Sequence, residues 1–298
     1  MEDLSGIHGV ICATVTPFDS QGRLDLEAMR QVVDYMAAQG VHGLFVGGTT
    51  GEGLSLSLEE RAALTEAVVE YADGRLIVIV HSGCITTADT IFVTRHAAAS
   101  GAAGAAMVVP FYYTFDDASI FQHFVSVAEA VPDLPLFIYA FPGNAKNGVS
   151  PGLLRRLRDA VPNIVGVKST DPDLVRFQDY LEVGGKNFLA FNGVDGLMLP
   201  ALALGARGQV SGNANAFPEL FRSLYDAYMR GDMQQARAKQ MLINGARRAL
   251  KDGLHPAYYK AVLRLRGVPA GEVRAPMREI TPQEQKEMER ALCELGLI

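Results

Sequence analysis

Lys168 is the residue of this sequence whose chemistry most needs an explanation. It lies in residues 164–169, a run of otherwise apolar or small side chains that is typical of a strand buried on both faces. A lysine is almost never buried without a partner, because removing an ammonium group from water costs several kcal/mol. Burial lowers the pKa of the amine, and a neutral amine can attack a ketone and form a Schiff base. A structural ion pair with an Asp or Glu is the alternative explanation.

Residues 47–53 form a glycine-rich segment at the end of another apolar run. The four glycines allow a sharp turn, and the hydroxyls of Thr49 and Thr50 can point inward from it. Backbone N–H groups and threonine hydroxyls in such a turn suit a carboxylate, whereas the lysine and long spacing of a phosphate-binding loop are absent. An ordinary turn between a strand and a helix is the alternative.

Two tyrosines lie at the ends of further apolar runs. Tyr112 follows residues 105–110, and Tyr139 lies within residues 134–141. A tyrosine hydroxyl can move protons, which an imine-forming lysine requires when it loses water and when the product is protonated. For either tyrosine alone, core packing is the simpler explanation. Together with Lys168, they predict an imine-forming site.

The chain alternates short β-branched runs with longer amphipathic stretches, the pattern of βα units around a parallel sheet. This pattern predicts eight strands, at residues 10–16, 43–48, 76–82, 105–110, 134–141, 164–169, 188–192 and 208–212. Eight such units without a Pro/Gly/Ser-rich linker indicate a (β/α)8 TIM barrel of the α/β class. In such a barrel the catalytic residues lie at the carboxyl ends of the strands.

Two helix starts and the C-terminal part of the chain complete this expectation. Ser57 is predicted to cap one helix, and Ser150 with Pro151 to begin another. From about residue 217 the pattern is helical, with helices expected near residues 217–230, 233–251, 255–265 and 282–295. We therefore expect a barrel catalytic domain over residues 1–225 and a C-terminal helical extension over 226–298. The extension should pack on the barrel or form a subunit contact, because its apolar faces need covering.

Composition narrows the classes of partner. The net charge is −6 and the sequence pI about 5.6, so no general basic surface for nucleic acid or an anionic membrane is expected. No apolar run reaches membrane-spanning length, and the first ten residues do not resemble a secretory signal, so we expect a soluble, cytoplasmic protein. The scattered histidines and Cys12, Cys84 and Cys293 match no metal or disulfide template, so neither a metal nor another cofactor is predicted.

Four motifs, in order, resemble the signature of the dihydrodipicolinate synthase and N-acetylneuraminate lyase family: GTTGE at 48–52, PFY at 110–112, YAFP at 139–142 and GVK at 166–168. The resemblance covers nearly the whole chain. It implies a class I, pyruvate-dependent aldolase or lyase, a carbon–carbon lyase on a TIM barrel, with no cofactor. It also implies a homotetramer whose partners are pyruvate and a small aldehyde or sugar acid.

The resemblance also implies residue roles. Lys168 would form the Schiff base with pyruvate, Tyr139 would be the general acid/base, and Tyr112 would reach into a neighbouring subunit's proton relay. Thr49 and Thr50, together with Gly48, would bind the pyruvate carboxylate, and the backbone carbonyl of Val210 would be an acceptor beside the imine.

The second substrate is where the chain departs from both family patterns. The synthase pattern has a carboxylate-binding arginine where this chain has Asn144, although Lys146 lies nearby. The lyase pattern Gly-x-Asp-Glu here reads Gly193, Val194, Asp195, Gly196, so one acidic residue is missing. The residues from His81 to Cys84 favour the sugar-acid branch. We therefore expect a 2-keto-3-deoxy sugar acid or related 2-oxo acid, with Gly193, Asp195, Asn213 and Asn144 as its contacts.

Other functions are consistent with the same residues. The first is a 4-hydroxy-tetrahydrodipicolinate synthase that joins pyruvate to aspartate semialdehyde in lysine biosynthesis. The second is a hydratase or dehydratase that uses the same imine. The third is a non-catalytic 2-oxo acid binding protein, which would bind pyruvate without turnover. A metal-dependent class II aldolase would lose activity with a chelator and survive replacement of Lys168. Asp195 can equally cap the helix that follows it.

Overall fold

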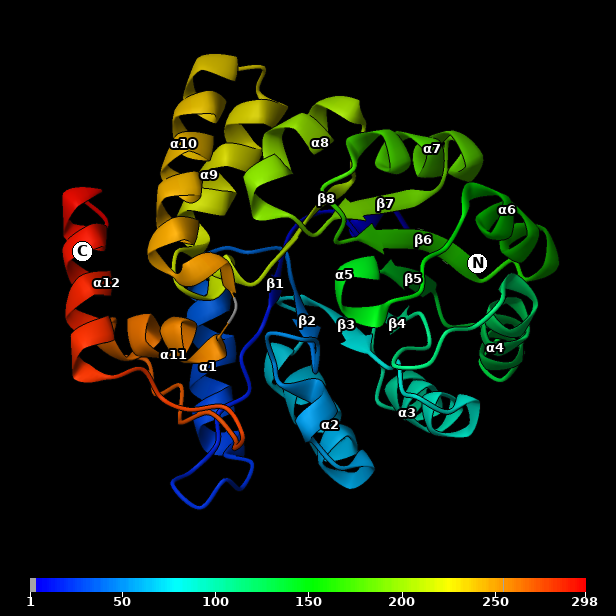
Figure 1. The fold of residues 1–298 in the computed structure, drawn as a ribbon, viewed down its shortest axis with the longest axis horizontal. Helices are drawn as coiled ribbons and strands as arrows, with labels where there is room; N and C mark the ends of the chain where they lie inside the picture. Colours follow the sequence, from blue (N-terminus) through cyan, green and yellow to red (C-terminus); the bar gives the residue numbers. More distant parts are fainter. Residues whose placement is uncertain (1–3, 254) are drawn as a thin grey trace.

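Eight parallel strands close into a barrel in a computed structural model that describes residues 4–253 and 255–298 (Figure 1). Each strand pairs with the next along the chain, and β8 closes the ring by pairing with β1. The strands are β1 (Gly9–Ala13), β2 (Gly43–Val46), β3 (Ile77–His81), β4 (Gly104–Val108), β5 (Leu136–Ala140), β6 (Ile164–Ser169), β7 (Leu189–Asn192) and β8 (Gly208–Ser211). The predicted (β/α)8 barrel is confirmed.

Most strands are shorter than the apolar runs that predicted them. The run at residues 10–16 continues past β1, but the Val15 N–H bonds to the Asn215 side chain (3.0 Å) instead of to a strand. The run at residues 43–48 continues past β2, where Gly47 adopts φ +67° and turns the chain. Apolar residues therefore extend beyond the ladder because the loops at the barrel mouth are themselves buried.

The helices surround the barrel, and two predicted starts are confirmed. Ser57 caps α2 through a capping box with Glu60, and Ser150 caps α6, whose first residue is Pro151. The helices up to the last strand are α1 (Leu26–Ala38), α2 (Leu58–Ala72), α3 (Thr87–Ala99), α4 (Asp117–Glu129), α5 (Pro142–Ala145), α6 (Pro151–Ala160), α7 (Leu174–Gly184) and α8 (Met198–Leu204).

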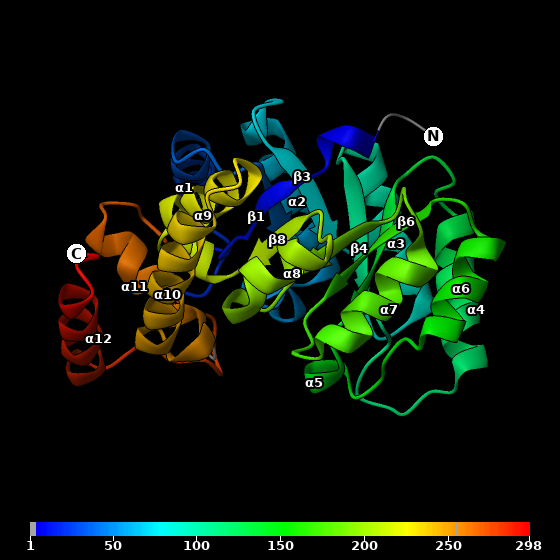
Figure 2. The ribbon, with the colours of Figure 1, turned by 90° about the horizontal axis from the view of Figure 1, so that it is seen from above.

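Four helices follow β8, close to the predicted bounds. They are α9 (Pro218–Met229), α10 (Met233–Ala249), α11 (Pro256–Leu265) and α12 (Pro282–Glu294). Figures 1 and 2 both show α10, α11 and α12 at one side of the barrel, with α12 outermost. The proposed division between residues 225 and 226 falls inside α9.

Two features of the fold matter for the site. All six residues of β6 are buried, as expected for a strand covered on both faces. Among the described residues, no helix has the length and apolar character needed to cross a membrane. The cytoplasmic location therefore stays a prediction.

Candidate active site

Lys168 lies near the carboxyl end of β6 and is 6% exposed. Its Nζ atom is 3.7 Å from the centre of the Tyr139 ring and 4.1 Å from that of Phe45. Burial lowers the pKa of the amine, while Tyr139 and Asp195 oppose that shift. Within the described chain, no carboxylate lies at ion-pair distance from Lys168. The structural ion pair is therefore not the reason for the buried lysine.

Tyr139 is held in place by the neighbouring strand and by aromatic rings. It is the residue of β5 that pairs with Lys168 of β6. Its ring stacks on Phe141 at 5.7 Å and meets His81 edge-on at 5.8 Å. Packing of this kind fixes the ring, so the hydroxyl has one defined direction relative to the amine.

His81 ends β3 and is the third titratable group at this point of the barrel. Its Nδ1 lies 3.1 Å from the Gly47 carbonyl oxygen. Burial, Arg61 and Lys168 hold the pKa of His81 well below its usual range, so the ring is neutral. Nδ1 then carries the proton and donates it to Gly47, and the buried Nε2, which has no partner among the described residues, is an acceptor.

Two contacts hold the glycine-rich turn after β2 in place. A Cβ atom at Gly53 would lie 1.7 Å from the Gly47 carbonyl oxygen, so only glycine fits there. Glu52 forms a fully buried ion pair of 2.7 Å with Lys260 of α11. Lys260 also donates to the Glu272 carbonyl oxygen at 2.6 Å. The C-terminal extension thus fixes the turn that presents Thr49 and Thr50.

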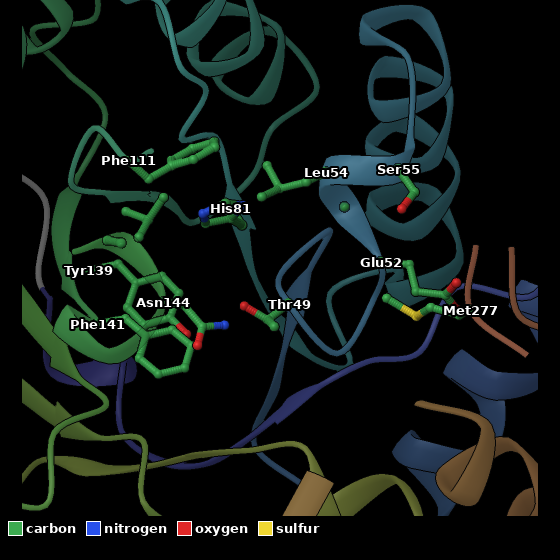
Figure 3. Close-up of a pocket in the computed structure, with 13 residues that line it drawn as sticks. Thr49, Glu52, Leu54, Ser55, His81, Phe111, Tyr139, Phe141, Asn144 and Met277 are labelled. Carbon is green, nitrogen blue, oxygen red and sulfur yellow. The ribbon is translucent and has the colours of Figure 1, made fainter. Parts of the chain in front are cut away.

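Two adjoining cavities share Thr49, Tyr139 and Phe141 in their walls. The larger, of about 290 Å³, contains most of the predicted site residues, namely Thr49, Thr50, Tyr139, Lys168, Gly193, Asp195, Val210 and Asn213. The smaller, of about 160 Å³, is lined by Asn144, His81 and Phe111. Figure 3 shows Asn144 beside the rings of Tyr139 and Phe141, across from Thr49. The strand ends therefore bring together residues that are far apart in the sequence.

Two predicted residues do not line either cavity. Gly48 is buried within the turn, and a Cβ atom there would lie 2.7 Å from the Phe45 ring. Tyr112 is 68% exposed on the loop after β4 and has φ +74°. Asn147 holds that loop, because its amide donates to the carbonyl oxygens of Pro110 (2.8 Å) and Tyr113 (2.7 Å).

Asp195 is buried and its carboxylate is already engaged by amides. Gln209 donates to one oxygen at 2.8 Å and Asn213 to the other at 2.6 Å. Burial raises the pKa of Asp195, and these donors oppose the shift. The neighbouring Asn213 Oδ1 is buried and has no partner in the described part of the chain. The Asn213 side chain therefore has one acceptor that no described group uses.

Sequence reasoning missed the contribution of the C-terminal extension. Arg247, Asp252, Gly253 and Tyr259 line the larger cavity, although none stands near a strand end in the sequence. His81 was used only as part of the motif that favoured the sugar-acid branch, although a histidine near the end of the predicted strand 76–82 should lie at the barrel mouth.

This arrangement suits imine chemistry with a small keto acid. It supplies a buried amine with a lowered pKa, a fixed phenol and a hydroxyl-bearing turn in one cavity. No group of three or more His, Cys, Asp or Glu residues that could hold a metal occurs within residues 4–253 and 255–298.

Comparison with known proteins agrees with this chemistry. The model of the dihydrodipicolinate synthetase family matches residues 6–295. The chain is 37% identical to a 4-hydroxy-tetrahydrodipicolinate synthase of Thermus thermophilus, covering 98% of this chain and 97% of the relative. It is 32% identical to an N-acetylneuraminate lyase of Rhizobium meliloti, covering 96% and 95%. A Ruminococcus gnavus sialic acid aldolase, solved as a catalytic lysine mutant, superposes with a TM-score of 0.94 at 28% identity, covering 99% of each chain.

Proposed function

The chain belongs to the dihydrodipicolinate synthetase family of class I pyruvate-dependent aldolases, which are carbon–carbon lyases, and we propose that its cavity joins pyruvate to an aldehyde, or reverses that reaction, through a Schiff base on Lys168. The observation that carries this proposal is a buried amine that has no carboxylate partner among residues 4–253 and 255–298 and lies 3.7 Å from the centre of the Tyr139 ring. The sialic acid aldolase that superposes on this chain also has a catalytic lysine.

In the proposed reaction the neutral Lys168 amine attacks the keto carbon of pyruvate. Tyr139 donates a proton to the hydroxyl of the carbinolamine, which leaves as water and gives a protonated imine. The Tyr139 oxygen then takes a proton from the pyruvate methyl group, producing an enamine. The enamine carbon bonds to the aldehyde carbon while Tyr139 returns the proton to the aldehyde oxygen. Water finally hydrolyses the imine and frees Lys168.

The proposed carboxylate site is the glycine-rich turn. Thr49 and Thr50 line the same cavity as Lys168, so their hydroxyls and N–H groups can bind the carboxylate of the imine. Gly48 belongs to this turn and accepts from the Gly53 N–H at 3.0 Å, and Val210, which lines the cavity from β8, is proposed to provide a backbone carbonyl beside the imine.

For the aldehyde, we propose aspartate semialdehyde as the first candidate, so that the enzyme is a 4-hydroxy-tetrahydrodipicolinate synthase. The relatives support this choice over the sugar acid that the sequence motifs favoured, because similar proteins of Thermus thermophilus and Pseudomonas aeruginosa carry that name at 37% and 33% identity. Asn144 lies in the wall of the smaller cavity at the position where the synthase pattern has an arginine. This part of the cavity wall therefore carries no charge.

One observation favours a 2-keto-3-deoxy sugar acid as the second candidate. Asn213 lines the cavity together with Asp195 and Gly193, and its buried Oδ1 has no partner within the described residues. A substrate hydroxyl would donate to it and remove the cost of a buried acceptor without a hydrogen bond.

We further propose a homotetramer in which Tyr112 enters a neighbour's site. In the single chain Tyr112 and Tyr113 are 68% and 60% exposed and meet edge-on at 5.0 Å. Exposed aromatic pairs are typical of interfaces. The native mass of the protein, compared with that of Tyr112→Ala, tests this assembly.

The aldehyde is tested by incubating the enzyme with pyruvate and either aspartate semialdehyde or a 2-keto-3-deoxy sugar acid, with products identified by mass spectrometry. A cyclic condensation product only from aspartate semialdehyde supports the synthase, whereas cleavage of the sugar acid to pyruvate supports the second candidate. Addition or loss of water without a change in carbon–carbon bonds would indicate a hydratase. Pyruvate binding without turnover of any of these compounds would indicate a binding protein.

A further inference from the structure

The C-terminal extension contributes a cation to the cavity that contains Lys168. Arg247 of α10 lines this cavity, together with Asp252, Gly253 and Tyr259. The Lys168 amine becomes part of the imine when pyruvate binds. The carboxylate of Asp195 already accepts hydrogen bonds from Gln209 and Asn213. Among the described residues that line this cavity, Arg247 is therefore the cationic group that remains for a second substrate.

The position of Arg247 is fixed by one face of α10. Gln240 donates to the Asp195 carbonyl oxygen at 3.0 Å and accepts from the Leu199 N–H at 2.9 Å, which attaches α10 to the segment after β7. Gln240 also donates to Asn244 at 3.1 Å. Residues four and seven positions after Gln240 lie on the same helix face, so Arg247 points toward the same segment.

Gly196 makes room for the guanidinium group. A Cβ atom at Gly196 would lie 3.5 Å from Arg247 Nε and 3.6 Å from Arg247 Cζ. The space that a longer side chain at position 196 would use is therefore occupied by Arg247. At this point the wall of the cavity is formed by Arg247 and its ion-pair partner Asp252.

The guanidinium group has donors that the described chain does not use. Its Nη1 pairs with Asp252, but its Nε is buried and has no hydrogen-bond partner among the described residues. A buried donor without a partner is unfavourable, and an arginine fork matches the oxygens of a carboxylate or phosphate. A neutral aldehyde would leave this donor unpaired.

We propose that Arg247 binds an anionic group, a carboxylate or a phosphate, on the aldehyde that reacts with the pyruvate imine. This inference rests on the proposed function and adds the chemical class of the second substrate. Arg247 of the C-terminal extension would then select anionic over neutral aldehydes. Lys168 and Tyr139 of the barrel strands would form the carbon–carbon bond.

The test is a calorimetric titration of the full-length enzyme after its pyruvate imine has been reduced with borohydride. Two pairs of probes differ in the anionic group alone or nearly so: succinate semialdehyde against butanal, and D-glyceraldehyde 3-phosphate against D-glyceraldehyde. Arg247→Met removes the guanidinium group and keeps an apolar stem, and Arg247→Lys keeps the charge without the fork. Arg248→Met is the matched control, because Arg248 is its exposed neighbour on α10.

The wild type should bind at least one anionic probe about 10- to 100-fold more tightly than its neutral counterpart. Arg247→Met should abolish this preference, Arg247→Lys should weaken it, and Arg248→Met should keep it. The pair that shows the preference identifies carboxylate or phosphate. Equal affinities in the wild type, or a preference that survives in a folded Arg247→Met protein, would overturn the proposal. If no pyruvate adduct forms, the proposed function fails, and titration of the untreated enzyme still tests Arg247.

Discussion

The Nζ atom of Lys168 lies 3.7 Å from the centre of the Tyr139 ring, and the two residues pair across β5 and β6. This relationship follows from the barrel itself, because paired residues near the carboxyl ends of adjacent strands present side chains to the same mouth. It places a buried amine next to a phenol whose ring is fixed by Phe141 and His81. The proposed nucleophile and the proposed proton donor thus lie side by side on adjacent strands of the barrel.

Tyr139→Phe should lower kcat by about 10²- to 10⁴-fold, the usual contribution of a positioned acid or base. The phenylalanine keeps the ring contacts, so the fold and the KM for pyruvate should change much less than kcat. Steady-state kinetics and thermal unfolding measure the two effects. Tyr180→Phe is the control, since Tyr180 is a buried tyrosine that donates to the Val149 carbonyl oxygen at 2.7 Å, outside the cavities. Equal losses of kcat in both variants would contradict the assigned role.

The buried pair Glu52–Lys260 should be strongly stabilising as a unit. Each of Glu52→Gln and Lys260→Met leaves one buried charge without its partner, which costs about 3–5 kcal/mol of unfolding free energy. The double variant should lose less than the sum of the two single losses, because no unpaired charge remains. Urea denaturation gives the three values.

An exposed pair provides the comparison for this cycle. Arg23 and Asp19 also lie 2.7 Å apart, but the Arg23 side chain is 71% exposed. Arg23→Met should therefore change stability little. Additive losses at Glu52 and Lys260 would show that the pair does not act as a unit.

Stability should fall as the pH decreases from about 6.5 to about 4. Burial lowers the pKa of His42 and of His123 to about 4, and that of His81 well below its usual range. Between these values and the ordinary histidine pKa the unfolded chain binds more protons than the folded chain. Their contribution to the unfolding free energy is therefore complete above the unfolded pKa and is lost as the pH falls toward the folded one.

His123 isolates this effect away from the cavities. His123 is 5% exposed. The wild type should lose more unfolding free energy than His123→Gln between pH 7 and pH 4, and the difference should be about 3 kcal/mol. Thermal unfolding measured at several pH values gives the two slopes. Parallel curves for the wild type and the variant would contradict the assignment.

The sequence predicted the barrel well because its strands are almost entirely buried and are therefore apolar in sequence. Residues 164–169 match β6 at both ends, and Ser57 and Ser150 cap the predicted helices, since capping chemistry is local. Strand ends at the barrel mouth were predicted too long because apolar loops there are buried without joining the sheet. The residues at strand ends, such as Thr49 and Tyr139, could be assigned to the mouth from topology alone.

The remaining part of the site depends on tertiary contacts. Arg247 faces the cavity because Gln240 attaches α10 to the segment after β7, and no local pattern in α10 indicates this contact. Likewise, the Lys260 partner of Glu52 comes from a helix distant in the sequence. Asn147, which fixes the loop that carries Tyr112 and Tyr113, reads in the sequence as an ordinary loop residue.

The most direct test of the central claim is borohydride trapping with pyruvate, read by intact mass and peptide mapping. The wild type should acquire one pyruvate-derived adduct that maps to Lys168, and Lys168→Ala should acquire none. The exposed Lys186→Ala should be modified like the wild type. A folded wild-type protein that acquires no adduct, or an adduct that persists in Lys168→Ala, would contradict the account.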